Sequence, residues 1–365
     1  MKRPVWLFSL DTEQFASPPM TTGALAAYFQ RYGETAERTD VRLVHFLQRE
    51  EIDAWLDREW EARERERARD AAAAGLTPVV GFSTYTWNAA EFLAAIRRLR
   101  ASCAELLVVA GGPHVQRAED YLHDEGIDVV VIGEGETTFQ KLLDCPSPDG
   151  WRGIEGLAFL DDEGRVHRTP RRNRQVDLDR LPTALDVIAL RDTDGNPRYQ
   201  RVAYETSRGC PFRCSFCEWG TGAIGTKMHQ FSLERIRSDF ERLIEGGIQD
   251  IWLCDSNFGA LKEDLDKARL IVELRKRTGH PSTFQTSWSK NHSKRVQEIV
   301  LLLHEHGLLH HYNLALQTLT PLALQLSNRK NMRSNQYEPI ARSMAADGVP
   351  IATELIWGLP GDNLA

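Results

Sequence analysis

The sequence has 365 residues, 42% of them hydrophobic and 27% charged, which is enough apolar material for two or three domains with buried cores. Its net charge of -7 argues against a broad electrostatic surface for nucleic acid, so small molecules or peptides are the expected partners. No apolar run approaches the length of a membrane-spanning helix, and the N-terminus turns acidic too early for a signal peptide, so we expect a cytoplasmic protein that does not bind membranes.

The first part of the chain, residues 1–148, is predicted to form a doubly wound α/β domain of the Rossmann-like type. Residues 52–75 mix acidic, basic and alanine residues, which favours a long helix that ends at Gly75 and presents a solvated charged face. Short apolar runs separated by helix-length segments are typical of parallel strands buried on both faces. These runs cover residues 5–10, 41–47, 78–86, 105–112 and 127–136.

Small residues follow three of these runs, where the strands are expected to end. They are Ser83 with Thr84, then 111–113, and then 133–137. The carboxyl ends of parallel strands meet at one edge of a sheet, where ligands bind in open α/β folds. A tight turn needs glycine with or without a ligand, so the signal is the coincidence of three such turns at one edge.

These stretches resemble the cobalamin-binding domain at the N-terminus of one large class of radical SAM enzymes (SAM, S-adenosylmethionine), in which the corrinoid lies across this edge. The resemblance covers about residues 1–145. His114 is expected to be a loop residue and not a cobalt ligand, because the chain has no Asp-x-His-x-x-Gly stretch. The resemblance implies that the cofactor is lined by Ser83, Thr84, Gly111, Gly112, Pro113, Gly133, Glu134, Gly135 and Thr137.

Residues 149–198 are predicted to form a hairpin and a linker between two domains. An apolar run from residue 154 is followed by a polar turn at 161–164, a second short strand and a stretch that contains proline. Arg171, Arg172 and Arg174 lie in this segment, and we expect them to be solvated and without a role in binding.

Three of the six cysteines, Cys210, Cys214 and Cys217, lie within eight positions, and the others are scattered. This is not the pattern of a secreted disulfide framework. Three thiolates in a C-x3-C-x2-C loop suit an iron-sulfur cluster and leave one iron open. Zinc is the alternative metal, but a structural zinc site needs a fourth ligand, and Glu218 and His229 are the only local candidates.

The cysteine spacing, with Phe216 directly before the last cysteine, resembles the signature of the radical SAM superfamily. An apolar run over 201–206 leads directly into the loop, as expected for that context. By this resemblance the three cysteines hold a 4Fe-4S cluster whose open iron chelates the amino and carboxylate groups of SAM. Phe216 is then expected to pack near the adenine.

Residues 199–365 are predicted to form a radical SAM partial (β/α) barrel. Strand-like runs begin near residues 201, 250, 282, 309 and 351, and amphipathic helical segments separate them. The superfamily barrel typically has six strands, so we expect a barrel that is incomplete, with the chain truncated after its fifth strand.

Polar residues at the carboxyl ends of these strands are candidate SAM contacts, because barrel active sites lie there. The resemblance places an amino-group contact after the second strand and ribose or carboxylate contacts after the third and fourth, which implies Asp255, Ser287 and Gln317. Gly358 follows the fifth strand. Asp255 departs from the commoner Gly-Gly-Glu form. Cys254 is expected to be a small strand residue, and the histidines of 304–311 are expected at the surface.

The resemblance implies an enzyme with a 4Fe-4S cluster, SAM and cobalamin, supplied by an external electron donor. The leading hypothesis is a methyltransferase that uses a 5'-deoxyadenosyl radical and the methyl group of methylcobalamin to methylate an unactivated carbon, or phosphorus, of a small molecule or peptide. The alternatives are a radical SAM enzyme that catalyses cyclisation or rearrangement, one without cobalamin, such as a methylthiotransferase or oxidoreductase, and a non-catalytic corrinoid-binding protein. No catalytic acid or base is predicted.

Overall fold

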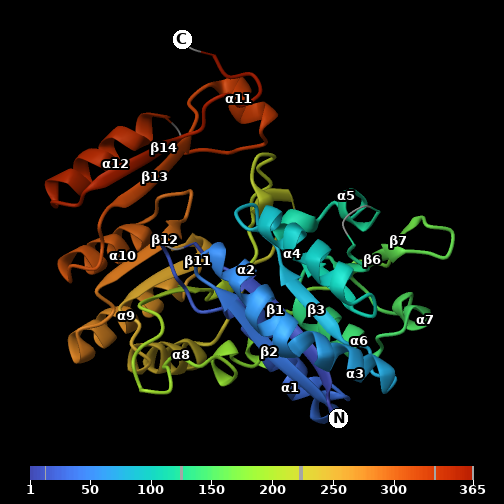
Figure 1. The fold of residues 1–365 in the computed structure, drawn as a ribbon. Coiled ribbons are helices and arrows are strands. Elements are labelled where there is room, and N and C mark those ends of the chain that lie inside the picture. Colours follow the sequence, from blue (N-terminus) through green and yellow to red (C-terminus); the bar gives the residue numbers. More distant parts are fainter. Residues whose placement is uncertain (13, 124–125, 222–224, 333, 364–365) are drawn as a thin grey trace. The chain divides into compact units, whose positions relative to one another are not determined.

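The computed structural model describes residues 1–365 except 13, 124–125, 222–224, 333 and 364–365 (Figure 1). The chain divides into two compact units. Unit 1 comprises Met1–Gln175 and Arg180–Ala189, and unit 2 comprises Val176–Asp179 and Leu190–Ala365. The sequence had set residues 149–198 apart as a hairpin and linker, whereas most of this segment packs as part of unit 1.

Unit 1 is built on a seven-stranded sheet in the order β2-β1-β3-β4-β5-β6-β7. The first five strands are parallel, and they are the five that the apolar runs predicted. The order 2-1-3-4-5 is a doubly wound topology, in which the ligand crevice lies at the carboxyl ends of β1 and β3. The strands are β1 (Arg3–Leu10), β2 (Thr39–Phe46), β3 (Val79–Ser83), β4 (Leu107–Gly111) and β5 (Val129–Val131).

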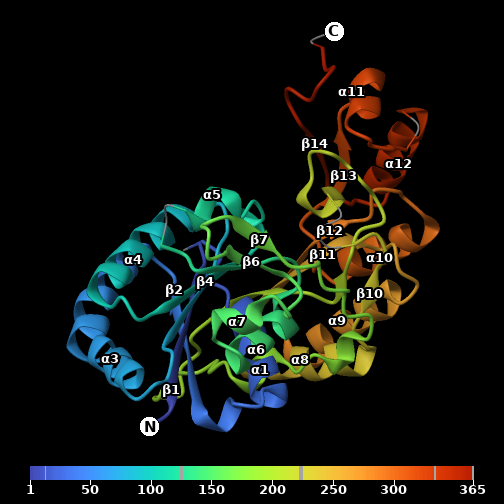
Figure 2. The same cartoon turned by 90° about the vertical axis from the view of Figure 1, so that its right-hand side faces the viewer.

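Helices cover both faces of this sheet, with α1 and α6 on one side and α3 and α4 on the other (Figure 2). Successive side chains of β1 enter two separate cores: Leu7 packs with Phe139, and Phe8 packs with Phe92. Burial on both faces explains the unbroken apolar runs. The helices are α1 (Met20–Tyr32), α2 (Glu50–Trp55), α3 (Arg65–Ala73), α4 (Ala89–Ser102), α5 (Glu119–Leu122), α6 (Gly135–Asp144) and α7 (Pro148–Trp151).

The long charged helix predicted at 52–75 is present as α2, a π-helical segment at Leu56–Glu64, and α3. It ends at Gly75, which has a φ of +74°. One of its carboxylates is not solvated: Glu64 is 5% exposed and accepts hydrogen bonds from Trp6 Nε1 at 3.1 Å and Arg42 Nη1 at 2.8 Å. The charged face is therefore partly an internal ion network.

The predicted hairpin consists of β6 (Leu157–Leu160) and β7 (Val166–Arg168). Gly164 N donates to Asp161 O at 2.8 Å and closes its turn. β6 pairs antiparallel with β5, so the hairpin extends the first sheet and is not a free linker. Backbone pairing with β6 closes the edge that β5 would otherwise leave open.

Unit 2 contains the five predicted barrel strands. β8, β11 and β12 form a parallel sheet, and β13 and β14 form a parallel pair. Phe284 N donates to Leu308 O at 3.1 Å, which ties the start of β12 to the segment before β13. The strands are β8 (Arg201–Tyr204), β11 (Asp250–Phe258), β12 (Thr283–Trp288), β13 (Tyr312–Gln317) and β14 (Ile351–Leu355).

Helices alternate with these strands (Figure 1). Ser232 caps α8 by accepting from Arg235 N, and Ser293 caps α10 by accepting from Val296 N at 3.2 Å. The helices are α8 (Leu233–Glu245), α9 (Asp264–Thr278), α10 (Lys294–Glu305), α11 (Pro321–Leu326) and α12 (Ser334–Ala346). In the part of the chain that the structure describes, no helix is both long and apolar enough to cross a membrane.

Candidate functional site

The three clustered cysteines lie on a loop that follows β8. The base of the loop is an antiparallel pair of two-residue strands, β9 (Ser207–Arg208) and β10 (His229–Gln230). Gly209 has a φ of +105°, and a Cβ there would collide with the carbonyl oxygen of Lys227. Glycine is therefore required where the chain enters the cysteine loop.

Backbone hydrogen bonds fold the loop onto itself. Cys217 N donates to Cys214 O at 3.2 Å, and Gly220 N donates to Cys217 O at 2.8 Å. Cys210 and Cys214 are buried, and Cys217 is half-buried. Among the described residues, no three His, Cys, Asp or Glu side chains are placed to hold one metal ion.

The proposed fourth zinc ligands do not change this result. His229 lies in β10 at the base of the loop. The side chain of Glu218 lies outside the described part of the structure.

Two nitrogen donors face the cysteine sulfurs. Asn257 Nδ2 lies 3.2 Å from Cys210 Sγ, and Lys290 Nζ lies 3.0 Å from Cys214 Sγ. An ammonium group can only donate, and a thiolate is the stronger acceptor form of cysteine. The thiolate is also the form that ligates iron, so this set of contacts fits an iron-sulfur cluster held by the loop.

Consecutive residues at the end of β11 hold the segment that leads into the loop. Ser256 Oγ donates to Gly209 O, and Asn257 Nδ2 donates to Cys210 Sγ. The Asp255 carboxylate accepts hydrogen bonds from Thr206 N and Ser207 N, which come just before Gly209 in the chain. These three consecutive residues of β11 therefore hold the start of the cysteine loop in position.

Asp255, predicted as a SAM contact, is placed differently from that expectation. Its carboxylate is fully buried and accepts from Thr206 N at 2.7 Å, Ser207 N at 2.9 Å and the Thr206 hydroxyl. Burial raises the pKa of the Asp255 carboxyl, and Lys267 opposes that rise. Lys267 Nζ in turn donates to Thr206 Oγ1 at 3.1 Å and to Asp264 Oδ1 at 2.9 Å. All oxygens of Asp255 thus face protein.

A cavity of about 350 Å³ opens beside the cysteine loop in unit 2. Its lining brings Cys210 and Cys217 together with three predicted site residues, Phe216, Ser287 and Gln317. The remaining lining residues are Trp219, Trp252, Ser256, Phe284, Gln285, Thr286, Trp288, Lys290, Leu309, His310, His311, Asn313, Ala315, Arg329 and Glu354.

The other residues singled out in this unit are placed as follows. Asp255 and Gly358 do not line the cavity. Cys254, expected to be a small residue packed in the strand, lies in β11 but is exposed. It shares its face of the strand with Trp252 and Ser256, which line the cavity. His310 and His311 are exposed, as expected, but they also line the cavity.

The cavity contains polar atoms without protein partners. Thr286 Oγ1 and Asn313 Oδ1 are buried and have no hydrogen-bond partner among the described residues. Gln317 has a φ of +65°, a conformation that non-glycine residues rarely adopt, and its Nε2 lies 3.3 Å from Glu354 Oε2. Unsatisfied buried atoms and backbone strain both favour a ligand-binding site here.

Arg329 is a lining residue that the sequence did not reveal. It is 6% exposed, and its guanidinium carbon lies 6.0 Å from the ring centroid of Phe216. It donates to Asn331 Oδ1 and to Ala315 O, each at 2.6 Å, and in the described part of the chain it forms no ion pair. A buried cation without a counter-ion favours an anionic ligand. Arg329 follows the short helix α11, and no local sequence motif marks this position.

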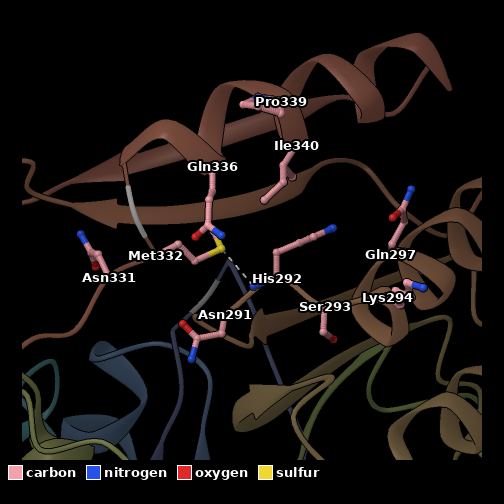
Figure 3. Close-up of a pocket in the computed structure, with 10 residues that line it drawn as sticks. All are labelled: Asn291, His292, Ser293, Lys294, Gln297, Asn331, Met332, Gln336, Pro339 and Ile340. Atoms are coloured by element: carbon pink, nitrogen blue, oxygen red, sulfur yellow. Dashed lines mark hydrogen bonds between the residues drawn. The ribbon is translucent and has the colours of Figure 1, made fainter.

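A second hollow, of about 640 Å³, lies between the start of α10 and α12 (Figure 3). His292 lies at its centre, where its backbone N–H donates to Met332 Sδ at 3.2 Å and its ring contacts the Tyr312 hydroxyl at 3.1 Å. Burial lowers the pKa of His292. None of the predicted site residues lines this hollow.

In unit 1, the predicted cobalamin residues after β3 and β4 meet. Thr84 N and Oγ1 donate to Gly111 O at 2.7 and 2.6 Å. Gly112 has a φ of +113°, and a Cβ there would collide with Thr84 O. Ser83 and Thr84 are buried, and Pro113 begins the next turn. The Thr84 side chain therefore shapes this edge of the sheet.

The predicted residues after β5 lie at the start of α6. Glu134 accepts from Arg174 Nε at 3.0 Å and Nη2 at 2.7 Å. Gly133 is exposed with a φ of +86°, Gly135 begins α6, and Thr137 Oγ1 donates to Tyr28 OH at 3.0 Å. Glu134, predicted to line the cofactor, is thus already engaged by a protein cation.

The arginines of 171–174 are not merely solvated. Arg172 pairs with Glu155 at 3.2 Å, and Arg174 pairs with Glu134 at 2.7 Å, because this segment, up to Gln175, belongs to unit 1. Arg174 Nη1 is buried without an acceptor among the described residues. This N–H group is therefore a buried hydrogen-bond donor next to Glu134, one of the predicted cofactor residues.

The carboxyl ends of the neighbouring strands β1 and β3 add residues that the sequence did not single out. Leu10 O, at the end of β1, accepts from Trp87 Nε1 at 3.3 Å and from Asn88 Nδ2 at 3.2 Å. Asp11 accepts from Thr12 N and Ser17 N, each at 2.7 Å, and burial raises the pKa of its carboxyl. Only the strand order, which places β1 beside β3, reveals this location.

Comparison with known proteins assigns both halves of the chain to families. Residues 24–143 match the B12 binding domain, and residues 204–365 match the Radical SAM superfamily. The 2-(S-pantetheinyl)-carbapenam-3-carboxylate methyltransferase of Streptantibioticus cattleyicolor is 33% identical over 307 residues, or 79% of this chain and 44% of the relative. The cobalamin-dependent radical SAM methyltransferase TokK of Streptomyces tokunonensis is 30% identical over 290 residues, or 77% of this chain and 42% of TokK.

The chain therefore spans less than half the length of these two relatives. Among solved structures, the radical SAM methyltransferase TsrM of Kitasatospora setae superposes on 99% of this chain and 69% of its own, with a TM-score of 0.65 and 20% identity, which shows a shared fold. The chain belongs to the radical SAM superfamily, and to those of its members that carry a B12 binding domain before the radical SAM domain.

Proposed function

We propose that this chain is the cofactor-binding part of a cobalamin-dependent radical SAM methyltransferase. The observation that carries the proposal is the cavity that joins the cysteine loop to Phe216, Ser287 and Gln317. When bound, the reduced 4Fe-4S cluster supplies the electron that cleaves SAM, and cobalamin supplies the methyl group. The substrate is a small molecule or a peptide, and the reductant is an external electron donor.

In this proposal SAM occupies the cavity. Arg329, a buried cation without a carboxylate partner in the described residues, binds the SAM carboxylate. The unsatisfied Thr286 Oγ1 and Asn313 Oδ1 hydrogen-bond the ribose, and Gln317 is held beside them by Glu354. Phe216 packs against the adenine. Asp255 has a positioning role behind the loop and makes no contact with SAM.

Aromatic side chains form part of the cavity wall. Trp219, Trp252, Phe284 and Trp288 line it together with the cysteines. Most of the remaining lining residues are polar and can hydrogen-bond SAM. This chain's contribution is therefore to orient SAM at the open iron.

In unit 1, cobalamin is proposed to lie at the carboxyl edge of β3, β4 and β5. Corrinoid side chains offer carboxamide and phosphate oxygens, which accept hydrogen bonds. Arg174 Nη1 is a buried donor without an acceptor among the described residues of this region, so it fits such a ligand. The edge also supplies the exposed backbone of Gly133.

Replacing Arg329 with glutamine is expected to weaken SAM binding by at least tenfold, because one charge-assisted hydrogen bond is worth about 1.5–3 kcal/mol. The dissociation constant is measured by anaerobic equilibrium dialysis with cluster-loaded protein. The matched control is Lys330→Gln, which removes the same charge from an exposed neighbour. Equal affinities for Arg329→Gln and the unaltered protein would exclude this role of Arg329.

Replacing Arg174 with glutamine is expected to weaken hydroxocobalamin binding by about tenfold, since a donor to the corrinoid is lost. Binding is followed through the absorbance of the corrinoid during titration. Arg172→Gln is the control, because Arg172 contacts Thr138 and Glu155 instead. If both variants bind hydroxocobalamin as the unaltered protein does, Arg174 lies outside the corrinoid site.

The proposed activity is tested by incubating the reconstituted chain anaerobically with SAM, hydroxocobalamin and titanium(III) citrate. Methyl transfer to the corrinoid releases S-adenosylhomocysteine, whereas radical cleavage releases 5'-deoxyadenosine. Both products are expected, and mass spectrometry quantifies them. 5'-Deoxyadenosine alone would favour the cyclisation or rearrangement alternative, and neither product would favour the non-catalytic corrinoid-binding protein.

A further inference from the structure

We propose that Lys290 and Asn257 set the reduction potential of the cluster by donating hydrogen bonds to the sulfurs of its ligands Cys214 and Cys210. The inference rests on the proposed function only in assuming that the loop holds a 4Fe-4S cluster. It assigns to two residues of this chain a role in making the cluster easier to reduce.

Lys290 is placed close to the cluster loop by the end of β12. Ser289 N donates to Phe258 O at 2.8 Å, which anchors the backbone next to Lys290. The ammonium lies 3.0 Å from Cys214 Sγ and 4.4 Å from the ring centroid of Phe212, both on the loop. In the described residues Lys290 forms no ion pair with a carboxylate, and Cys214 Sγ accepts the hydrogen bond of its ammonium.

Asn257 reaches the other sulfur from within the core. It is fully buried, and its Nδ2 donates to Cys210 Sγ at 3.2 Å and is 3.1 Å from Ser256 Oγ. Its Oδ1 is buried and has no partner among the described residues. If the Asn257 amide were rotated by 180°, its Oδ1 would face the electron-rich Cys210 Sγ, which is unfavourable. The observed orientation keeps the Nδ2 donor at Cys210 and leaves Oδ1 without a partner among the described residues.

Both contacts are expected to raise the reduction potential of the cluster. Reduction moves one electron from the external donor onto the cluster, and the added negative charge is shared with the ligand sulfurs. N–H donors and a nearby positive charge stabilise that charge more than the charge of the oxidised state, so they raise the reduction potential. Lys290 carries a full charge and is expected to have the larger effect.

The test is an anaerobic redox titration of the cluster-loaded chain in the absence of SAM, followed by electron paramagnetic resonance. At a fixed potential, Lys290→Gln is expected to lower the ratio of reduced to oxidised cluster about tenfold, which is 59 mV for a one-electron couple. Asn257→Leu should shift the ratio the same way by a smaller factor. Lys290→Arg, which keeps the charge and the donors, should stay close to the unaltered protein.

The matched control is Lys294→Gln, which removes the same charge four residues later at an exposed position. Signals are normalised to bound iron, so a variant that loads fewer clusters still reports its potential. An unchanged ratio in Lys290→Gln, or an equal shift in Lys294→Gln, would overturn the inference. An unchanged ratio combined with weaker SAM binding would identify Lys290 as a SAM ligand instead.

The two hypotheses fail separately. If the unaltered chain loads a cluster whose potential depends on Lys290 but transfers no methyl group, the proposed function fails and this inference stands. If methyl transfer occurs and the potential is insensitive to both residues, this inference fails and the proposed function stands.

Discussion

Cys214→Ala is expected to lower bound iron from about four atoms per chain to less than one. A cluster with only three protein ligands does not stay bound when one of these ligands is removed. Cys214 is buried in the loop, and its backbone oxygen accepts from Cys217 N. Iron and acid-labile sulfide are measured after anaerobic reconstitution. Cys210→Ala and Cys217→Ala should behave alike, with loss of the visible absorption of the cluster.

The control for this experiment is Cys254→Ala. Cys254 is an exposed cysteine of β11 outside the loop, so its removal should leave the iron content unchanged. Retention of four irons by Cys214→Ala, or loss of iron in Cys254→Ala, would contradict the assignment of the loop as the cluster site.

Asp255→Leu is expected to destabilise unit 2 by about 3–5 kcal/mol, the usual cost of removing one partner from a buried charged network. The change leaves the N–H groups of Thr206 and Ser207 without their acceptor and removes a negative charge near buried Lys267. Urea denaturation measures the free energy of unfolding. Asp255→Asn keeps one acceptor oxygen and is expected to cost less.

The same variant separates a positioning role from a SAM contact. If Asp255 holds the loop, Asp255→Leu also lowers the iron content, whereas a residue that only touches SAM would leave iron and stability unchanged. Asp266→Asn, at an exposed position on α9, is the control and is expected to change stability by less than about 0.5 kcal/mol. A stable, fully loaded Asp255→Leu protein would contradict the positioning role.

Most strands of unit 1 could be predicted because they are short apolar runs buried on both faces. The strands of unit 2 are less buried, and their alternation with amphipathic helical segments made them predictable. The position of β6 and β7 could not, because pairing of the hairpin with β5 depends on a partner that is adjacent only in the folded sheet. The strand order in unit 1 likewise came from the structure, and with it the hydrogen bond from Trp87 Nε1 to Leu10 O.

The site was predictable where it is local in sequence. The cysteine spacing and Phe216 lie on one loop, and the ends of β12 and β13 place Ser287 and Gln317 in the cavity. Asp255 differs because the pleat of β11 decides which neighbour faces inward, and a shift of one residue reverses that direction.

The contacts that the sequence did not predict join residues far apart in the chain. Lys290 meets Cys214 over 76 positions, and Arg174 meets Glu134 over 40. Arg329 follows a short helix and reaches back to Ala315 at the end of β13. No local pattern marks such contacts, because each exists only after the elements have packed.

The central claim is that one chain holds both an iron-sulfur cluster and a corrinoid. It is tested most directly by the iron and cobalt content after anaerobic reconstitution with added hydroxocobalamin and removal of unbound cofactor. The account predicts about four irons and one cobalt per chain. About four irons without cobalt would contradict it, and would leave a radical SAM protein whose first unit does not bind the corrinoid.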